Sequence, residues 1–152
     1  MKKRRLVIMG LFAIGAVLVL CSCGGGGGNK RLTKEQFAAK ANAICVSFNN
    51  ANSATGTPAN INEAIAQVEK LTPLYEKRIT DLGKLKPPSN EQAAVNRVVA
   101  LEKKTASLAK DVLAALKKND VVTANKLIQS GKADNKEAKG LFKTLGLTAC
   151  SK

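Results

Sequence analysis

The chain has 152 residues, of which 45% are hydrophobic and 3% aromatic, with a net charge of +14 and no histidine or tryptophan. This length fits one domain, and so few aromatic residues leave a core of aliphatic side chains and alanine, which favours helices over strands. Without histidine the chain cannot use a histidine-dependent catalytic triad, histidine-ligated zinc or haem, or a histidine pH switch, and we expect no cofactor.

The N-terminus has the pattern of a bacterial export signal. Met1–Arg5 carries four basic residues, and Leu6–Leu20 is an uncharged run that is short for a membrane-spanning helix, which needs about 20 residues. The sequence Leu20-Cys21-Ser22-Cys23 then resembles the lipobox of bacterial lipoproteins, with an aliphatic residue three positions before the last cysteine and a small residue directly before it. The resemblance implies cleavage before Cys23 and a lipid, with acyl chains such as palmitate, on that cysteine.

We therefore divide the chain into a signal peptide at 1–22, a lipidated cysteine with a flexible tether at 23–32, and a helical domain at 33–152. Gly24–Gly28 contains only glycine, so it cannot hold a fold and suits a flexible spacer. Two or three acyl chains would hold the domain on the extracytoplasmic face of the cell membrane. The alternative is an uncleaved transmembrane helix at 4–23, which also places the domain outside the cytoplasm.

The first helix is predicted to start at Thr33, because Thr33-Lys34-Glu35-Gln36 has the spacing of a capping box, and to end in the polar run Asn49–Asn60. Its apolar residues recur at helical spacing: Phe37, Ala41, Ile44 and Phe48. The second helix is predicted to begin near Asn60 and to end at Gly83. Pro73 lacks a backbone donor, so this helix is expected to be kinked there or to break and restart with Thr72 as its cap.

The third helix has the clearest pattern. Ser89-Asn90-Glu91-Gln92 again has capping-box spacing. Seven residues then alternate at intervals of four and three: Ala94, Val98, Leu101, Thr105, Leu108, Val112 and Ala115. Such a seam is typical of helices in left-handed bundles. The fourth helix is predicted to be capped by Asp120, to be weak at Gly131–Asn135, and to end in a Schellman motif at Gly146-Leu147.

These elements predict an all-α fold, an antiparallel four-helix bundle, because short connections favour antiparallel neighbours. The alternatives are a three-helix bundle with a broken second helix and an intermolecular coiled coil. Four caps and three turns divide the chain too often to favour the coiled coil.

Two cysteines remain after cleavage of the signal peptide, which removes Cys21, and lipidation of Cys23, namely Cys45 and Cys150. An even number of cysteines in an exported protein predicts a disulfide that staples the fold. A redox-active pair would need closely spaced thiols and a group that lowers their pKa, and the sequence shows neither. Two free thiols are the remaining alternative.

Several short segments resemble a group of small helical lipoproteins from high-GC Gram-positive bacteria. They are Leu32-Thr33, Phe37, Ala41–Cys45, Asn49, the turn Leu85–Pro88 and the closing Gly146–Cys150. In that group a cysteine on the first helix is matched by one at the C-terminus. The resemblance therefore supports the lipoprotein location and the disulfide, and it implies no particular activity.

No catalytic arrangement is recognisable, and we do not expect an enzyme. The four candidate acids Glu63, Glu69, Glu76 and Glu102 have the pattern of solvated helix charges. With only one tyrosine and four phenylalanines to stack on bases, nucleic acid is not expected as a partner either. The sequence predicts a non-enzymatic binding or scaffolding role in the cell envelope.

Four of the 25 basic residues lie in the signal peptide, which leaves 21 basic against 11 acidic residues and a net charge of +10. This surface either contacts anionic lipid headgroups or cell-wall polymers, or only keeps the domain soluble. The candidate contacts are Lys84, Lys86, Lys103, Lys104, Lys117 and Lys118. The alternative function is a carrier of a small apolar ligand, if the small residues Ala115, Gly131 and Ala138 leave a cavity between helices rather than allowing close packing.

Overall fold

The computed structural model describes residues 30–152, so the predicted signal peptide, the lipobox with Cys23 and the glycine run lie outside the described residues. The described chain consists of α1 (Lys34–Ser53), α2 (Ile61–Lys84), the single 3-10 turn η1 (Ser89–Glu91), α3 (Gln92–Lys117), α4 (Val121–Ser130) and α5 (Lys132–Thr144). No strand occurs between residues 30 and 152. The all-α class predicted from the composition is confirmed.

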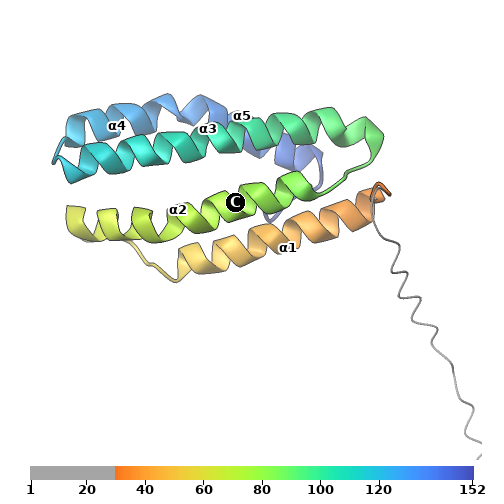
Figure 1. Ribbon diagram of the computed structural model, residues 1–152, viewed down its shortest axis with the longest axis horizontal. Coiled ribbons are helices and arrows are strands. Elements are labelled where there is room, and N and C mark those ends of the chain that lie inside the picture. Colours follow the sequence, from red (N-terminus) through yellow and green to blue (C-terminus); the bar gives the residue numbers. More distant parts are fainter. Residues whose placement is uncertain (1–29) are drawn as a thin grey trace, which may run out of the picture.

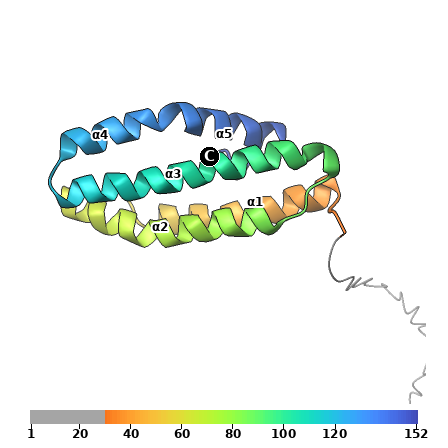
Figure 2. The same ribbon diagram turned by 45° about the horizontal axis from the view of Figure 1, so that its top comes forward.

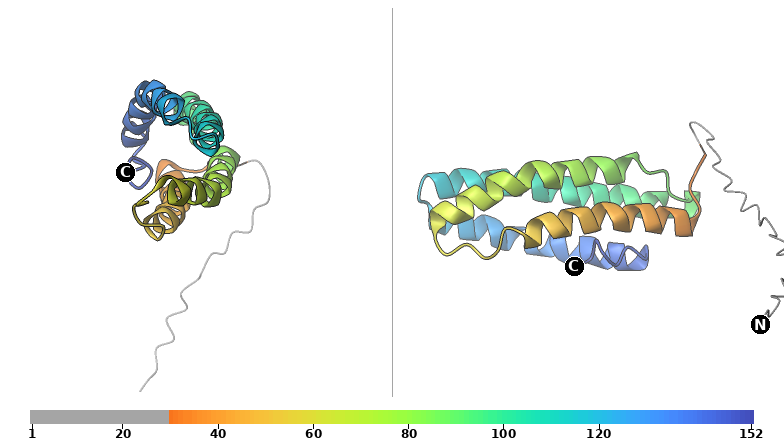
Figure 3. Two further views of the ribbon diagram at one scale, coloured as in Figure 1. Left: turned by 90° about the vertical axis from the view of Figure 1, so that its left-hand side faces the viewer. Right: turned by 90° about the horizontal axis from the view of Figure 1, so that it is seen from below.

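The helices lie lengthwise beside one another (Figures 1 and 2). α1 packs against α2, α2 against α3, and α3 against both α4 and α5, so α3 is the element with the most neighbours. Seen end-on, α1 and α2 form one pair, and α3 lies with α4 and α5 in a second group (Figure 3). The tail after α5 returns to α1, where the Ala149 amide donates to Asn42 Oδ1 at 2.9 Å.

The start of α1 follows the predicted capping box. The Gln36 amide donates to Thr33 Oγ1 at 3.3 Å, and the Thr33 amide donates to Gln36 Oε1 at 3.1 Å. The helix ends at Ser53, inside the polar run Asn49–Asn60 where its end was predicted. Asn49 Nδ2 donates to the carbonyl of Ala149 at 2.8 Å, and this contact with the C-terminal tail stabilises the last turns despite their low helix propensity.

α2 is one continuous helix across Pro73, so of the two expectations, a kink or a break with a restart, the break is wrong. Thr72 does not cap a new helix, because its Oγ1 donates to the carbonyl of Val68 one turn earlier, at 2.7 Å. Pro73 removes the backbone donor for the carbonyl of Glu69. Both residues are exposed, so water can bond to that carbonyl and the helix continues.

The predicted seam of α3 is confirmed, since all seven of its residues are buried or half-buried. Val95, Glu102 and Ala106, which lie beside the seam, are buried as well. The reason is that α3 packs against α2 on one side and against α4 and α5 on another.

The predicted capping box of α3 is wrong. Ser89 begins η1 instead and makes no capping bond through its side chain. The Gln92 side chain, which would complete the box, accepts from Arg31 Nη1 at 2.7 Å and donates to Asn96 Oδ1 at 2.9 Å. These contacts lie outside the local segment, so the tetrapeptide pattern alone does not reveal them.

The predicted fourth helix is two helices, α4 and α5, which meet at Gly131. Asp120 caps α4 as predicted, accepting from the Thr123 amide at 2.9 Å. A Cβ atom on Gly131 would lie 2.6 Å from Leu108 Cδ2. Because glycine has no side chain, the backbone at Gly131 can approach α3 closely.

The C-terminal tail is fixed by the predicted Schellman motif and by a disulfide. Gly146 has φ +74°, and the Leu147 amide donates to the carbonyl of Phe142 at 2.8 Å, which confirms the motif. This turn directs the tail toward α1, where Cys150 and Cys45 are joined by a disulfide with 5.1 Å between their Cα atoms.

The hydrophobic core is divided into two clusters. The larger cluster includes Phe37, Leu101 and Phe142 together with the disulfide, and the smaller one is built around Val112 and Ala124. Along α3, the stretch between Leu101 and Val112 therefore passes from one cluster to the other, and it includes the buried Glu102. None of the helices within residues 30–152 is long and apolar enough to cross a membrane.

Candidate functional site

The interior between the two clusters contains a buried ion pair. Arg78 Nη2 of α2 is in direct contact with Glu102 Oε2 of α3, and each side chain is only 7% exposed. The prediction that Glu102 is a solvated helix charge is therefore wrong. Glu63 accepts the Ala59 amide at the start of α2, while Glu69 and Glu76 form exposed ion pairs across to α3.

Two aromatic rings flank the guanidinium of Arg78. Its Cζ atom lies 4.9 Å from the ring centroid of Phe48 and 4.6 Å from that of Tyr75. The two rings also meet edge-on, with 5.4 Å between their centroids. A cation over an aromatic face is attracted by the quadrupole of the ring, so both rings help to compensate for the hydration that Arg78 loses.

This arrangement is costly for the folded state. Removing two charges from water costs several kcal/mol per ion, and a buried pair often stabilises a protein no more than well-packed apolar residues do. Arg78 Nε is buried without a hydrogen-bond partner. Burial also lowers the pKa of Arg78 and raises the pKa of Tyr75. Because stability does not explain such a group, we treat it as a candidate functional site.

A cavity of about 570 Å³ opens beside the ion pair. Arg78, Tyr75 and Glu102 belong to its lining, together with residues of α1, α5 and the C-terminal tail. Its α5 wall includes Asn135 and Lys139, four residues apart and therefore on one face of the helix. The cavity thus joins a buried charge on α2 to polar side chains from helices that are distant in the sequence.

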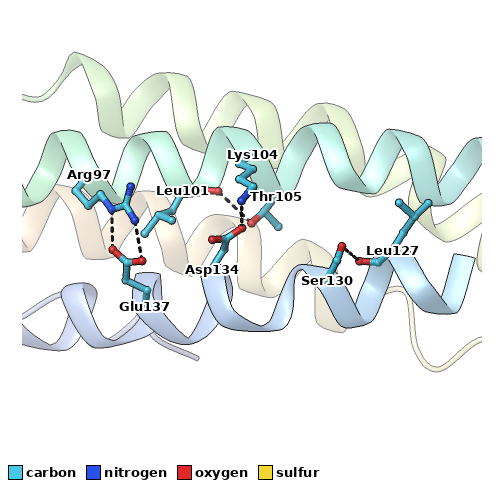
Figure 4. A network of polar contacts seen from close by, with 8 residues as sticks. All are labelled: Arg97, Leu101, Lys104, Thr105, Leu127, Ser130, Asp134 and Glu137. Atoms are coloured by element: carbon cyan, nitrogen blue, oxygen red, sulfur yellow. Dashed lines mark hydrogen bonds and ion pairs between the residues drawn. The ribbon is translucent and has the colours of Figure 1, made fainter.

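The position of α5 at this cavity is set by polar contacts with α3 (Figure 4). Arg97 donates two hydrogen bonds to Glu137, at 2.6 and 2.8 Å, and Lys104 forms an ion pair with Asp134 at 2.7 Å. The Arg97 hydrogen bonds also lower the pKa of the Glu137 carboxyl. These pairs are solvent-exposed and contribute little stability. They hold Asp134 and Glu137 toward α3, which leaves the face with Lys139 to the cavity.

The six lysines predicted to contact anionic surfaces do not lie together. Three of them are ion-paired with carboxylates of the domain, namely Lys84 with Asp81, Lys104 with Asp134 and Lys117 with Glu69. Lys103 and Lys118 form no ion pair within residues 30–152. Lys86 precedes α3 and Lys118 follows it, so the 26 residues of α3, about 39 Å at 1.5 Å per residue, separate them.

No protein-family model, curated protein or solved structure matches this chain. Its function must therefore be inferred from its own residues. In the described part of the chain, no group of three or more histidine, cysteine, aspartate or glutamate side chains is placed to hold a metal ion.

The sequence carries one local signal that points to Arg78. Tyr75, Arg78 and Leu82 are spaced by three and four residues, so they share one helix face. An arginine in the middle of a buried face is unusual and requires a partner. The identity of this partner, Glu102, depends on how α2 packs against α3. No local pattern in either helix specifies that packing.

Tyr75 is expected to lose its phenolic proton only at a pH above the ordinary tyrosine value of 10.0, because burial raises its pKa. It is the only tyrosine of the chain, so the ultraviolet absorbance of tyrosinate reports on it alone. Burial favours the neutral phenol of Tyr75 in the folded state. The stability that Tyr75 contributes is therefore complete below pH 10 and is lost as the pH rises through its higher pKa in the folded chain. The unfolded chain is the control. Equal midpoints in the folded and unfolded chains would contradict this prediction.

Proposed function

We propose that this chain is a lipid-anchored, extracytoplasmic lipoprotein with a non-enzymatic binding or scaffolding role in the cell envelope. The observation that carries the proposal is the disulfide between Cys45 and Cys150, because structural disulfides persist in oxidising compartments outside the cytoplasm. The N-terminal sequence supplies the means of export and anchoring, with a basic start, an apolar run and the lipobox ending at Cys23.

We also propose that the helices form an antiparallel four-helix bundle, in which α4 and α5 together are the fourth member. The sequential packing of α1 on α2, α2 on α3, and α3 on α4 and α5 supports this arrangement. The close approach at Gly131 supports the view that the small residues of the fourth member bring the helices together. It does not favour the alternative function, a carrier of an apolar ligand, and the polar lining of the 570 Å³ cavity does not favour it either.

The anchor would hold one particular end of the domain near the membrane. The Leu32 amide donates to the carbonyl of Lys86 at 2.8 Å, and Arg31 Nη1 donates to the carbonyl of Pro87 at 3.0 Å. Arg31 and Leu32, which the sequence places in the tether, therefore already contact the domain. Lys84 and Lys86 lie at this end, which we call the tether end. We propose that the tether end faces anionic lipid headgroups.

The anchor itself is tested by the intact mass of the full chain after extraction from the membranes of an expressing bacterium. We expect a chain that begins at Cys23 and carries added acyl mass. A Cys23→Ala variant is expected to keep residues 1–22 and to carry no lipid. A wild-type chain found at full length without lipid would contradict the proposal.

The tether end is tested by two variants that remove the same charge. Lys84→Gln/Lys86→Gln should weaken binding of the full chain to vesicles of anionic phospholipid by roughly tenfold or more at low salt, since each lysine near such a surface contributes about 1 kcal/mol. Lys117→Gln/Lys118→Gln, at the opposite end of α3, should change binding little. The two variants remove the same charge, and Lys84 and Lys117 are each ion-paired with a carboxylate of the domain. Equal effects of the two variants would show that the charge acts without regard to its position.

A further inference from the structure

We propose that the cavity beside Arg78 and Glu102 is a binding site for a small organic anion that carries hydroxyl groups. This inference does not depend on the lipid anchor or on the lysines of the tether end. It rests on the buried ion pair, on the charge of the cavity lining, and on side chains that have no partner within the domain.

The cavity is lined by more basic than acidic side chains. Arg78, Lys139 and Lys152 line it, and Glu102 is its only carboxylate side chain. Glu102 is already in contact with Arg78, and Lys139 forms no ion pair within residues 30–152. An anion that enters the cavity would therefore meet at least one cation that has no carboxylate partner.

Arg78 is the buried element of the site. Its side chain is 7% exposed, and its Nε has no hydrogen-bond partner among the described residues. A hydrogen bond left unmade by a buried charged group costs more free energy than a hydrogen bond left unmade at the surface. Arg78 also lines the cavity, and the reduced hydration there would strengthen the attraction of its guanidinium for an anion.

The remaining lining matches hydroxyl groups and carbon atoms. Asn50 and Asn135 supply side-chain amides that make no hydrogen bond within the described chain, and Thr105 supplies a hydroxyl oxygen whose proton is donated to the Leu101 carbonyl. Amides and hydroxyls both donate and accept, as a sugar hydroxyl requires of its partners. Phe48 and Phe142 add apolar surface for the carbon skeleton. A volume of about 570 Å³ lies within the usual range of small-molecule sites.

The test measures the fluorescence of Tyr75 in the full chain, with glucuronate, glucose 6-phosphate and uncharged glucose as probes. Tyr75 lines the cavity and is the only tyrosine, and the chain has no tryptophan, so the intrinsic signal comes from the site. We expect a saturable change with at least one of the two anions, and binding of glucose that is weaker by about tenfold or more. The preferred anion would identify the carboxylate or the phosphate as the recognised group.

Lys139→Gln should weaken anion binding by roughly fivefold, the effect of one lost charge at a partly exposed site. Lys136→Gln, on the same helix but not in the cavity lining, removes the same charge and should leave binding unchanged. Both positions are exposed, so neither variant is expected to disturb folding. The proposal is overturned if neither anion changes the Tyr75 signal, if glucose binds as well as the anions do, or if both variants weaken binding equally.

Discussion

Replacing Cys45 and Cys150 together by alanine is expected to lower the free energy of unfolding by about 2–5 kcal/mol. The two cysteines are 105 residues apart, and closing a loop of about 100 residues removes unfolded-state entropy worth about 4.7 kcal/mol in the chain-entropy model. Both cysteines are buried, with 0% and 5% of their surface exposed, so alanine avoids placing a new polar group in the core. Denaturant unfolding of the variant and the wild-type full chain measures the difference.

The wild-type chain treated with a reductant is the control, because it loses the cross-link but keeps both side chains. It should unfold at nearly the same denaturant concentration as the variant. If the free energy of unfolding falls by well below about 1 kcal/mol in both the variant and the reduced wild-type chain, a loss on the order of one surface contact, then other contacts hold the tail. Those contacts are the hydrogen bonds of Asn42 and Asn49 to Ala149 and the burial of Leu147.

The features that the sequence predicts correctly are those in which a local pattern decides the structure. The capping box at Thr33, the cap at Asp120 and the Schellman motif at Gly146 each depend on a few neighbouring residues. The seam of α3 is a periodic pattern over seven positions, and one helix suffices to define it. Such signals need no knowledge of which elements later pack together.

The wrong predictions lie where contacts between distant segments decide. Ser89 lies in η1 before α3, where the Gln92 amide donates to the Ser89 carbonyl, and the Gln92 side chain bonds to Arg31, 61 residues earlier. The fourth helix divides at Gly131, where the chain passes close to Leu108 of α3. At Pro73 the exposed position of the residue allows α2 to continue. In each case the local pattern is real, and the tertiary environment outweighs it.

The candidate site was missed for the same reason. Glu102 has the sequence pattern of a surface charge, and Arg78 was not singled out. Their burial follows from the packing of α2 on α3, and Lys139 reaches the same cavity from α5. Four elements and the C-terminal tail contribute to the lining, so no contiguous motif describes it. Sites of this kind become visible only when the packing is known.

Single and double variants of the buried ion pair between Arg78 and Glu102 are expected to differ in stability. Glu102→Leu is expected to lower the free energy of unfolding by about 3–5 kcal/mol, because it leaves the charge of Arg78 buried without its partner. Arg78→Met/Glu102→Leu removes both charges and should be within about 1 kcal/mol of the wild type, or more stable. Methionine suits this position because its sulfur also packs favourably beside aromatic rings such as Phe48 and Tyr75.

Glu137→Gln is the matched control, since it removes one carboxylate from an ion pair that is solvent-exposed. Its side chain is 43% exposed beside Arg97, so the loss should stay below about 1 kcal/mol. Denaturant unfolding of the full chain compares all three variants. If the double variant is as stable as the wild type but no longer binds the anionic probes, the ion pair is retained for binding and not for folding. If the double variant loses as much stability as Glu102→Leu, the pair is required by the fold, and the buried charge is no longer evidence for a ligand.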